Sequence, residues 1–321
     1  MKKKVKFKLK KGPKLVILGI LVLVVVGIVG SKIKEDIDYK KSNEYLLLQK
    51  GYSTDEVSTI LGYEEDRINL FLNRDYNSTL YELFLEKYFI YDNLDKYLEY
   101  KEKNKDMDLS KVVAMVNVHR NEAFYDNSRN ADTTLEELML VNKYYKLDEN
   151  YTDSDMVSVS GKYGFAGNKV YQNVLDAFVK MYNAALSEDI QLIMNGSYRS
   201  YKDQDNTWAG RKRIKGEAAA DSYTARAGYS EHQSGYAMDI DQYNYSGDDF
   251  KESPANTWLL NNAYKYGFIQ RYPEGLEDIT GFNYEPWHYR YVVSEVLSSP
   301  LVTKEWCRID ATKSKCVDHC C

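Results

Sequence analysis

Histidine and cysteine are both scarce in this chain of 321 residues, which contains four of each. No cysteine precedes Cys307, and the other three are Cys316, Cys320 and Cys321. Two adjacent cysteines are poorly placed to close a tetrahedral structural zinc site. The residues instead favour one or two disulfides, provided that the chain leaves the cytoplasm. We expect a cysteine-containing C-terminal tail over 303–321, ragged from about 311 onwards.

The first 14 residues contain no acidic side chain and eight lysines. An uninterrupted run of Leu, Val, Ile and Gly then extends from Leu15 to Gly30. No clear signal-peptidase site follows it, so we expect an uncleaved transmembrane anchor over 15–31 rather than a secretory signal. Lysines on the N-terminal side predict that the basic tail 1–14 stays in the cytoplasm. The chain would then be a single-pass cell-membrane protein with its remaining residues outside the cell.

The charge of the chain argues against nucleic acid as a partner. The whole chain has 43 basic and 48 acidic residues, and without the eight N-terminal lysines the balance is 35 to 48. Nucleic-acid binders depend on attraction between basic side chains and phosphates. A part of the chain with a net charge of −13 lacks that attraction, so we expect no nucleic-acid partner.

The segment 32–106 reads as a charged linker followed by a small helical module. Gly51 is a typical helix stop, and Ser53 with Glu56 forms a capping box that opens the next helix. Two helices around a glycine turn superficially resemble a DNA-binding helix-turn-helix. Acidity and the predicted topology argue against that interpretation, and a spacer is the simpler one.

From residue 107 to 302 the pattern changes to a mixture of short strands and helices. Apolar runs predict strands at Val112–Val116, Leu138–Val141, Ile190–Met194 and Tyr236–Ile240. Helical spacing predicts helices at Val170–Leu186, from Tyr201 onwards, and from Ser253 to about Tyr266. Because there is no regular alternation of strand and helix, we expect an α+β domain with a small antiparallel sheet flanked by helices.

Two short stretches of this region hold half of the histidines. His232 is followed seven residues later by Asp239, and Glu285 precedes His288 by three. Gly235 favours a turn that leads into the strand carrying Asp239, so the loop and the strand each supply one side chain. Pro286 disfavours a helix after Glu285, and an irregular or bulged segment there could direct both side chains to one centre.

Together these residues are the components of a catalytic zinc centre. Two imidazoles and one carboxylate leave an open position for water, and the spare carboxylate of Glu285 is a general base. Either pair alone would be weak evidence, since His–Asp and Glu–His pairs are common structural contacts. Their joint occurrence in a histidine-poor chain favours the metal centre. His119 has no partner motif, and we interpret it as structural.

The residues then match the motifs of a known family. The patterns are Ser-x-His-x-x-Gly-x-Ala-x-Asp at 230–239, Glu-x-Trp-His at 285–288 and Gly-Ser-Tyr-Arg-Ser-x-x-x-Gln at 196–204. They resemble the zinc D-alanyl-D-alanine carboxypeptidases of the VanY type, which include L,D-carboxypeptidases of peptidoglycan. The resemblance covers about 107–300, with its motifs in family order, so 107–302 would be a zinc carboxypeptidase domain.

The resemblance implies a role for each motif residue. His232, Asp239 and His288 would hold Zn²⁺, and Glu285 would activate water. The substrate-binding residues would be Arg199, Gln204 and Ser230. A planar guanidinium suits a terminal carboxylate, although Arg199 taken alone could equally form an ordinary ion pair.

Three further residues near the motifs have expected supporting roles. Arg290 and Asp241 are candidates for orienting the ligating histidines, which usually need a second hydrogen-bond partner. Trp287 is expected to pack beside the site and to take no part in the chemistry.

We therefore expect a membrane-anchored zinc carboxypeptidase that removes a C-terminal D-amino acid from peptidoglycan stem peptides. The bond cleaved would be either D-Ala-D-Ala in pentapeptides or L-x-D-Ala in tetrapeptides. Two alternatives stay open: an endopeptidase on the same scaffold, and a catalytically silent wall-binding protein. The helical module would then be a spacer or a small wall-contacting module.

Overall fold

In a computed structural model of the chain, residues 11–152 and 154–292 are described, with side chains from residue 20 onwards. The chain divides into two compact units, Met1–Glu82 and Leu83–Cys321. The expected tail at 303–321, with its disulfides, lies outside the described residues, as does most of the basic tail. The domain boundaries at 106 and 302 stay a prediction.

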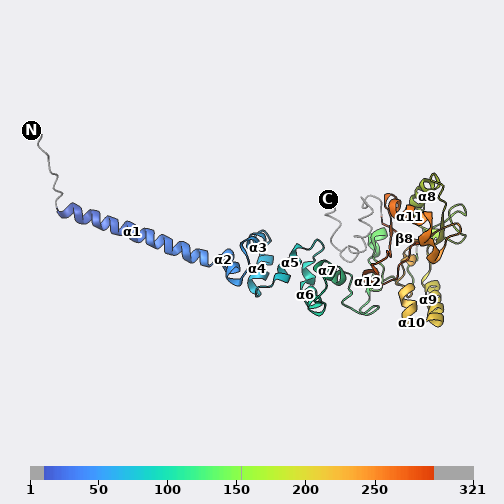
Figure 1. Cartoon of the computed structure of the whole chain (residues 1–321), viewed down its shortest axis with the longest axis horizontal. Coiled ribbons are helices and arrows are strands. Elements are labelled where there is room, and N and C mark those ends of the chain that lie inside the picture. Colours follow the sequence, from blue (N-terminus) through green and yellow to red (C-terminus); the bar gives the residue numbers. More distant parts are fainter. Residues whose placement is uncertain (1–10, 153, 293–321) are drawn as a thin grey trace, which may run out of the picture. The chain divides into compact units, whose positions relative to one another are not determined.

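The first unit is helical (Figure 1). Its elements are α1 (Lys11–Lys40), α2 (Asn43–Lys50), α3 (Thr54–Ile60), α4 (Glu65–Asn73) and the start of α5 (Ser78–Leu85). The predicted helix stop is confirmed, because Gly51 caps α2 in the left-handed conformation, and so is the capping box of Ser53 and Glu56. The anchor predicted at 15–31 finds no support, since no helix among the described residues is long and apolar enough to cross a membrane.

The second unit combines helices with short strands. Its helical elements are η1 (Tyr91–Asn93), α6 (Leu94–Lys103), α7 (Leu109–Asn117), η2 (Thr133–Leu138), α8 (Gln172–Leu186), α9 (Tyr201–Lys215), α10 (Glu217–Tyr223), η3 (Glu231–Ser234), η4 (Gly247–Glu252), α11 (Pro254–Asn262), η5 (Ala263–Tyr266) and α12 (Glu277–Thr280). The three predicted helices correspond to α8, α9 and α11 with η5. They are confirmed.

Two predicted strands were wrong. Val112–Val116 lies in α7, which Asp108 caps by accepting a hydrogen bond from the Lys111 amide. Each residue of that run is buried, so its continuous apolar character reflects a helix enclosed on all sides and not a strand. Leu138–Val141 forms no strand because Leu138 ends η2 and the Met139 carbonyl accepts from Arg290 at 2.8 Å instead of from a neighbouring strand.

A four-stranded antiparallel sheet forms the centre of the second unit, as predicted. Its strands, in the order β5-β6-β8-β7, are β5 (Leu192–Gly196), β6 (Ala237–Gln242), β8 (His288–Tyr291) and β7 (Phe268–Gln270). Two pairs of very short strands accompany it: β1 (Arg129–Asn130) with β2 (Tyr145–Lys146), and β3 (Val157–Ser158) with β4 (Lys169–Val170). The α+β class is confirmed.

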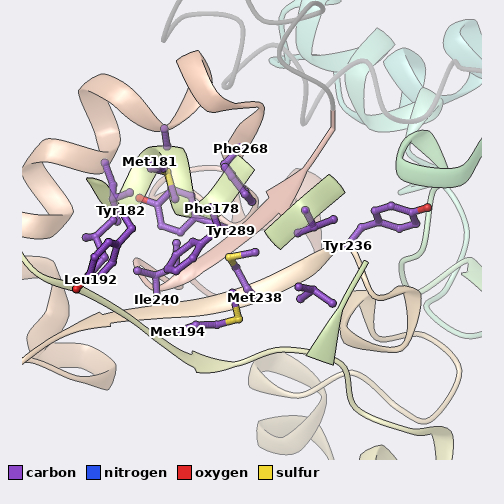
Figure 2. Close-up of a cluster of buried hydrophobic side chains, with 14 of the residues drawn as sticks. Phe178, Met181, Tyr182, Leu192, Met194, Tyr236, Met238, Ile240, Phe268 and Tyr289 are labelled. Carbon is purple, nitrogen blue, oxygen red and sulfur yellow. The ribbon is translucent and has the colours of Figure 1, made fainter. Parts of the chain in front are cut away.

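The two faces of the sheet present different kinds of side chain. Met238 and Ile240 of β6 and Tyr289 of β8 belong to the hydrophobic core with side chains of α8 (Figure 2). Since successive side chains of a strand point to opposite faces, the residues between them point the other way. Asp239 and His288 therefore share the face away from the core.

Candidate metal centre

Asp239 and His288 lie side by side on adjacent strands. They are directly paired in the register between β6 and β8, and Oδ1 of Asp239 lies 3.2 Å from Nδ1 of His288. Opposite Asp239 on β5 is Gly196. A Cβ atom at Gly196 would lie 2.8 Å from Oδ2 of Asp239, so the carboxylate occupies space that only glycine leaves free.

His232 reaches the same centre from the short helix η3. Ser230 caps this helix by accepting a hydrogen bond from the His232 amide, and Gly235 ends it with a left-handed φ of 78°. Nε2 of His232 lies 3.4 Å from Oδ2 of Asp239. Its other ring nitrogen, Nδ1, lies 2.7 Å from the carbonyl oxygen of Ser197. The loop therefore supplies one histidine and the strand the carboxylate, as the sequence predicts.

The three predicted ligands fit a metal ion. One donor atom from each of His232, Asp239 and His288 lies within 4.8 Å of the others. The donors are two imidazole nitrogens and one carboxylate oxygen, a set that suits zinc and leaves an open ligand position. Both histidines are buried, and Asp239 is largely buried.

Glu285 lies beside this group in an irregular segment before β8. Its amide donates to the carbonyl of Tyr272 at 3.0 Å, and Oε2 lies 3.8 Å from Nδ1 of His288. Burial raises the pKa of Glu285 to about 7, His288 opposes the shift, and Asp239 adds to it. A carboxylate with that pKa can accept and return a proton near neutral pH.

Arg199 and Gln204 form one hydrogen-bonded pair at the site. Nη1 of Arg199 donates to Oε1 of Gln204 at 3.0 Å, and Nε2 of the buried Gln204 donates to the carbonyl of Ala225 at 2.7 Å. The Arg199 amide also donates to the carbonyl of His232 at 3.2 Å. A backbone hydrogen bond thus joins the predicted substrate-binding segment at Arg199 to the predicted metal-binding segment at His232. The oxygen and the nitrogen of the Gln204 amide each have a partner.

A cavity of about 160 Å³ brings these groups together. Its walls include the three metal-ligand candidates, Glu285, Arg199, Gln204, Ser230 and Trp287. All predicted site residues therefore border one space, which the Glu285 carboxylate and the Arg199 guanidinium share with the three metal-ligand candidates.

The other predicted residues lie further from the centre. Nη1 of Arg290 lies 3.3 Å from Oε1 of Glu231, which in turn lies beside His288. Asp241 accepts a hydrogen bond from Asn195, and burial raises the pKa of Asp241 to about 6. His119 bonds the Tyr145 hydroxyl at 3.0 Å, in keeping with a structural role.

Glu231 is a site residue that the sequence did not single out. Its side chain is 1% exposed, and its Oε2 lies 3.3 Å from Nε2 of His288. Its Oε1 accepts from Nε of Arg271 at 2.8 Å. The only local signal is its place in the metal motif, next to His232. Arg271 and His288 are 40 and 57 residues away, so no local pattern reveals the contacts.

Comparisons with known proteins agree with the site. Residues 167–294 match the family model VanY, described as D-alanyl-D-alanine carboxypeptidase. The YodJ protein of Bacillus subtilis strain 168 is 41% identical over 163 residues, which cover 48% of this chain and 59% of YodJ. The chain thus spans about three fifths of the length of that relative.

Two further similar proteins are covered by this chain over a larger share of their own length. The bifunctional D-Ala-D-Ala dipeptidase and D-Ala-D-Ala carboxypeptidase VanXYC of Enterococcus gallinarum is 34% identical over 48% of this chain and 83% of that protein. A solved structure of the LdcB LD-carboxypeptidase is 35% identical, covers 58% of this chain and 87% of that one, and superposes with a TM-score of 0.50. The chain therefore belongs to the VanY family of D-alanyl-D-alanine carboxypeptidases.

Proposed function

We propose that this chain is a zinc-dependent carboxypeptidase that removes a C-terminal D-amino acid, D-Ala, from peptidoglycan stem peptides. The observation that carries the proposal is the convergence of His232, Asp239 and His288 with Glu285 on one cavity that Arg199 also lines. The similarity to the bifunctional dipeptidase and carboxypeptidase VanXYC and to the LdcB LD-carboxypeptidase supports this reaction class. Intact ligands and an intact base argue against a silent wall-binding protein.

Glu285 performs the proton transfers in this account. When bound, zinc polarises the scissile carbonyl and makes the attacking water more acidic. The Glu285 carboxylate accepts the proton of that water and then delivers it to the amine of the departing D-amino acid. Its raised pKa, about 7, suits both transfers. The side chain is 12% exposed, so bulk water competes little for that proton.

Arg199 binds the terminal carboxylate of the substrate. Its guanidinium can give two parallel hydrogen bonds to a carboxylate, and it lines the metal cavity. Gln204 holds Nη1 of Arg199 and is itself fixed by Ala225. We therefore assign Gln204 to orienting Arg199 and not to contacting the peptide. Ser230 lines the cavity, and its hydroxyl can bond the peptide backbone there.

Mass spectrometry of products tests the reaction. The zinc-loaded protein is incubated with pentapeptide and tetrapeptide muropeptides. Loss of a single terminal D-Ala from either is expected, and the substrate that loses it identifies a D,D or an L,D preference. In a parallel incubation with a cross-linked muropeptide, cleavage inside the cross-link without release of free D-Ala would favour the endopeptidase alternative. A folded, zinc-loaded protein that leaves both substrates intact would contradict the proposal.

We also infer a location at the cell membrane, with the N-terminus in the cytoplasm and the catalytic domain outside. The support is the eight lysines of 1–14 followed by the apolar run Leu15–Gly30. The full chain should sediment with membranes, and a variant that begins at residue 40 should be soluble and active on free muropeptides. Equal sedimentation of both proteins would contradict the anchor, and an inactive but folded, zinc-loaded variant would contradict our domain division.

A further inference from the structure

Glu231 is a carboxylate enclosed by protein. Its side chain is 1% exposed, and a buried charge is tolerated only when it is well paired. Its pairing is divided between its two oxygens. Oε1 accepts from Nε of Arg271 at 2.8 Å and lies 3.3 Å from Nη1 of Arg290. Oε2 lies 3.3 Å from Nε2 of His288.

The arginines that pair with Oε1 are themselves buried. The side chain of Arg271 is 4% exposed and that of Arg290 is 3% exposed. Nη2 of Arg290 donates to the carbonyls of Glu137 and Met139 at 2.9 and 2.8 Å. Both guanidiniums are cations without an acceptor atom. The hydrogen bond from Arg271 and the ion pair with Arg290 therefore hold Oε1 on their side and leave Oε2 for His288.

The imidazole of His288 has one nitrogen on each side. Nε2 faces Glu231, and Nδ1 faces Asp239 at 3.2 Å. A neutral imidazole carries one N–H and one lone pair, and its partner decides which nitrogen has the proton. An ionised carboxylate only accepts. A proton on Nε2 satisfies Glu231 and leaves the Nδ1 lone pair for a metal.

We propose that Glu231 is a positioning residue that selects the His288 tautomer able to bind zinc through Nδ1. The inference rests on the proposed function, since it takes His288 as a zinc ligand. His232 is oriented differently, because its Nδ1 faces the carbonyl of Ser197 at 2.7 Å. The two ligating histidines thus use opposite ring nitrogens, and only His288 depends on Glu231.

The change Glu231→Gln separates this role from charge pairing alone. An amide offers one oxygen and one NH₂ group, and Arg271 and Arg290 both require the oxygen. The NH₂ group is then turned toward Nε2 of His288, where it can only meet a lone pair. The proton moves to Nδ1, and the nitrogen that faces Asp239 can no longer bind a metal.

The test measures the zinc affinity of the full chain by competition with a chromophoric chelator. Loss of such an outer partner costs about 10- to 100-fold in metal affinity, and we expect that loss in Glu231→Gln. Glu188→Gln is the matched control, because Glu188 accepts only from Trp258 in the described contacts and should bind zinc like the wild type. Imidazole ¹⁵N spectra at saturating zinc should show the Nε2–H signal of His288 in the wild type, displaced in Glu231→Gln, with the signals of His232 unchanged.

Zinc binding by folded Glu231→Gln with wild-type affinity and an unchanged His288 signal would overturn the assignment. If this variant does not fold, Glu231→Asp replaces it. The aspartate keeps the charge for the arginines but is one methylene too short to reach His288, so the same weakening is expected and wild-type affinity would again overturn the inference. A wild-type chain that binds no zinc would instead refute the proposed function.

Discussion

Asp239 and His288 are 49 residues apart in sequence, yet they are directly opposite each other on β6 and β8, with Oδ1 3.2 Å from Nδ1. The pairing places two of the three candidate metal ligands on the central sheet of the second unit. Side chains on adjacent strands are held more precisely than side chains on loops. The strand register that buries the core on one face of the sheet therefore also brings Asp239 and His288 together on the other face, and η3 adds His232.

Glu285→Gln should retain zinc and lose nearly all turnover. The three candidate ligands are unchanged, while removal of a general base costs about 10²- to 10⁴-fold in rate. Zinc content and kcat on muropeptides check this together. Near wild-type hydrolysis by the variant would show that another group accepts the proton.

The pH dependence of kcat/KM should identify the same residue. Glu285 must be ionised to accept a proton, and burial raises its pKa from 4.5 to about 7. Bound zinc favours the ionised carboxylate and lowers its pKa, so the pKa of Glu285 in the zinc-loaded protein should lie between 4.5 and about 7. Activity should therefore fall with decreasing pH, about tenfold per unit below the pKa. If the residual activity of Glu285→Gln falls at low pH in the same way as the wild-type activity, another group causes that fall.

Arg199→Lys should lower kcat/KM by at least about tenfold, equivalent to roughly 1.4 kcal/mol. Lysine keeps the charge but cannot reproduce a two-pronged contact with a carboxylate, and a misplaced peptide bond slows the chemical step as well as binding. A peptide with an amidated C-terminus is the control substrate. It should be poor for the wild type and lose little more in the variant, whereas equal losses on both substrates would mean that Arg199 only supports the fold.

Gln204→Leu should impair both stability and activity. The change leaves Nη1 of Arg199 and the carbonyl of Ala225 without their partner, and an unsatisfied buried group costs about 1–3 kcal/mol. The midpoint of thermal unfolding should fall, and KM for the peptide with a free terminal carboxylate should rise. The control is Gln172→Leu, whose amide bonds the exposed Asp176. If Gln204→Leu matches this control in both measurements, Gln204 does not orient Arg199.

The sequence marks the candidate metal ligands and Glu285 because each of the two motifs that contain them is short, whereas the meeting of the two motifs depends on the pairing of β6 with β8. His232 and Asp239 fall within one turn-and-strand segment, and Pro286 marks the irregular segment between Glu285 and β8. Helix signals were equally local, as the capping box of Ser53 with Glu56 shows. Each of these features depends on residues within a few positions of one another.

The errors concern features that depend on distant contacts. Val112–Val116 looked like a strand because every side chain is apolar, but the run is a helix buried on all sides. Glu231 gave no signal, since Arg271 and His288 reach it from other strands or strand ends. The contact of Gln204 with substrate stays a prediction, and only the fold reveals that its amide also bonds Arg199 and Ala225.

Release of free D-alanine by the metal-free protein, measured before and after zinc is added back, tests the central claim most directly. The purified full chain is stripped with a chelator, assayed on stem peptides that end in D-Ala, and assayed again after addition of one equivalent of zinc. We predict no release from the stripped protein, restored release with zinc, and no restoration when zinc is added to Glu285→Gln. Unchanged D-alanine release by the fully stripped protein, or none after zinc is bound, would contradict the account.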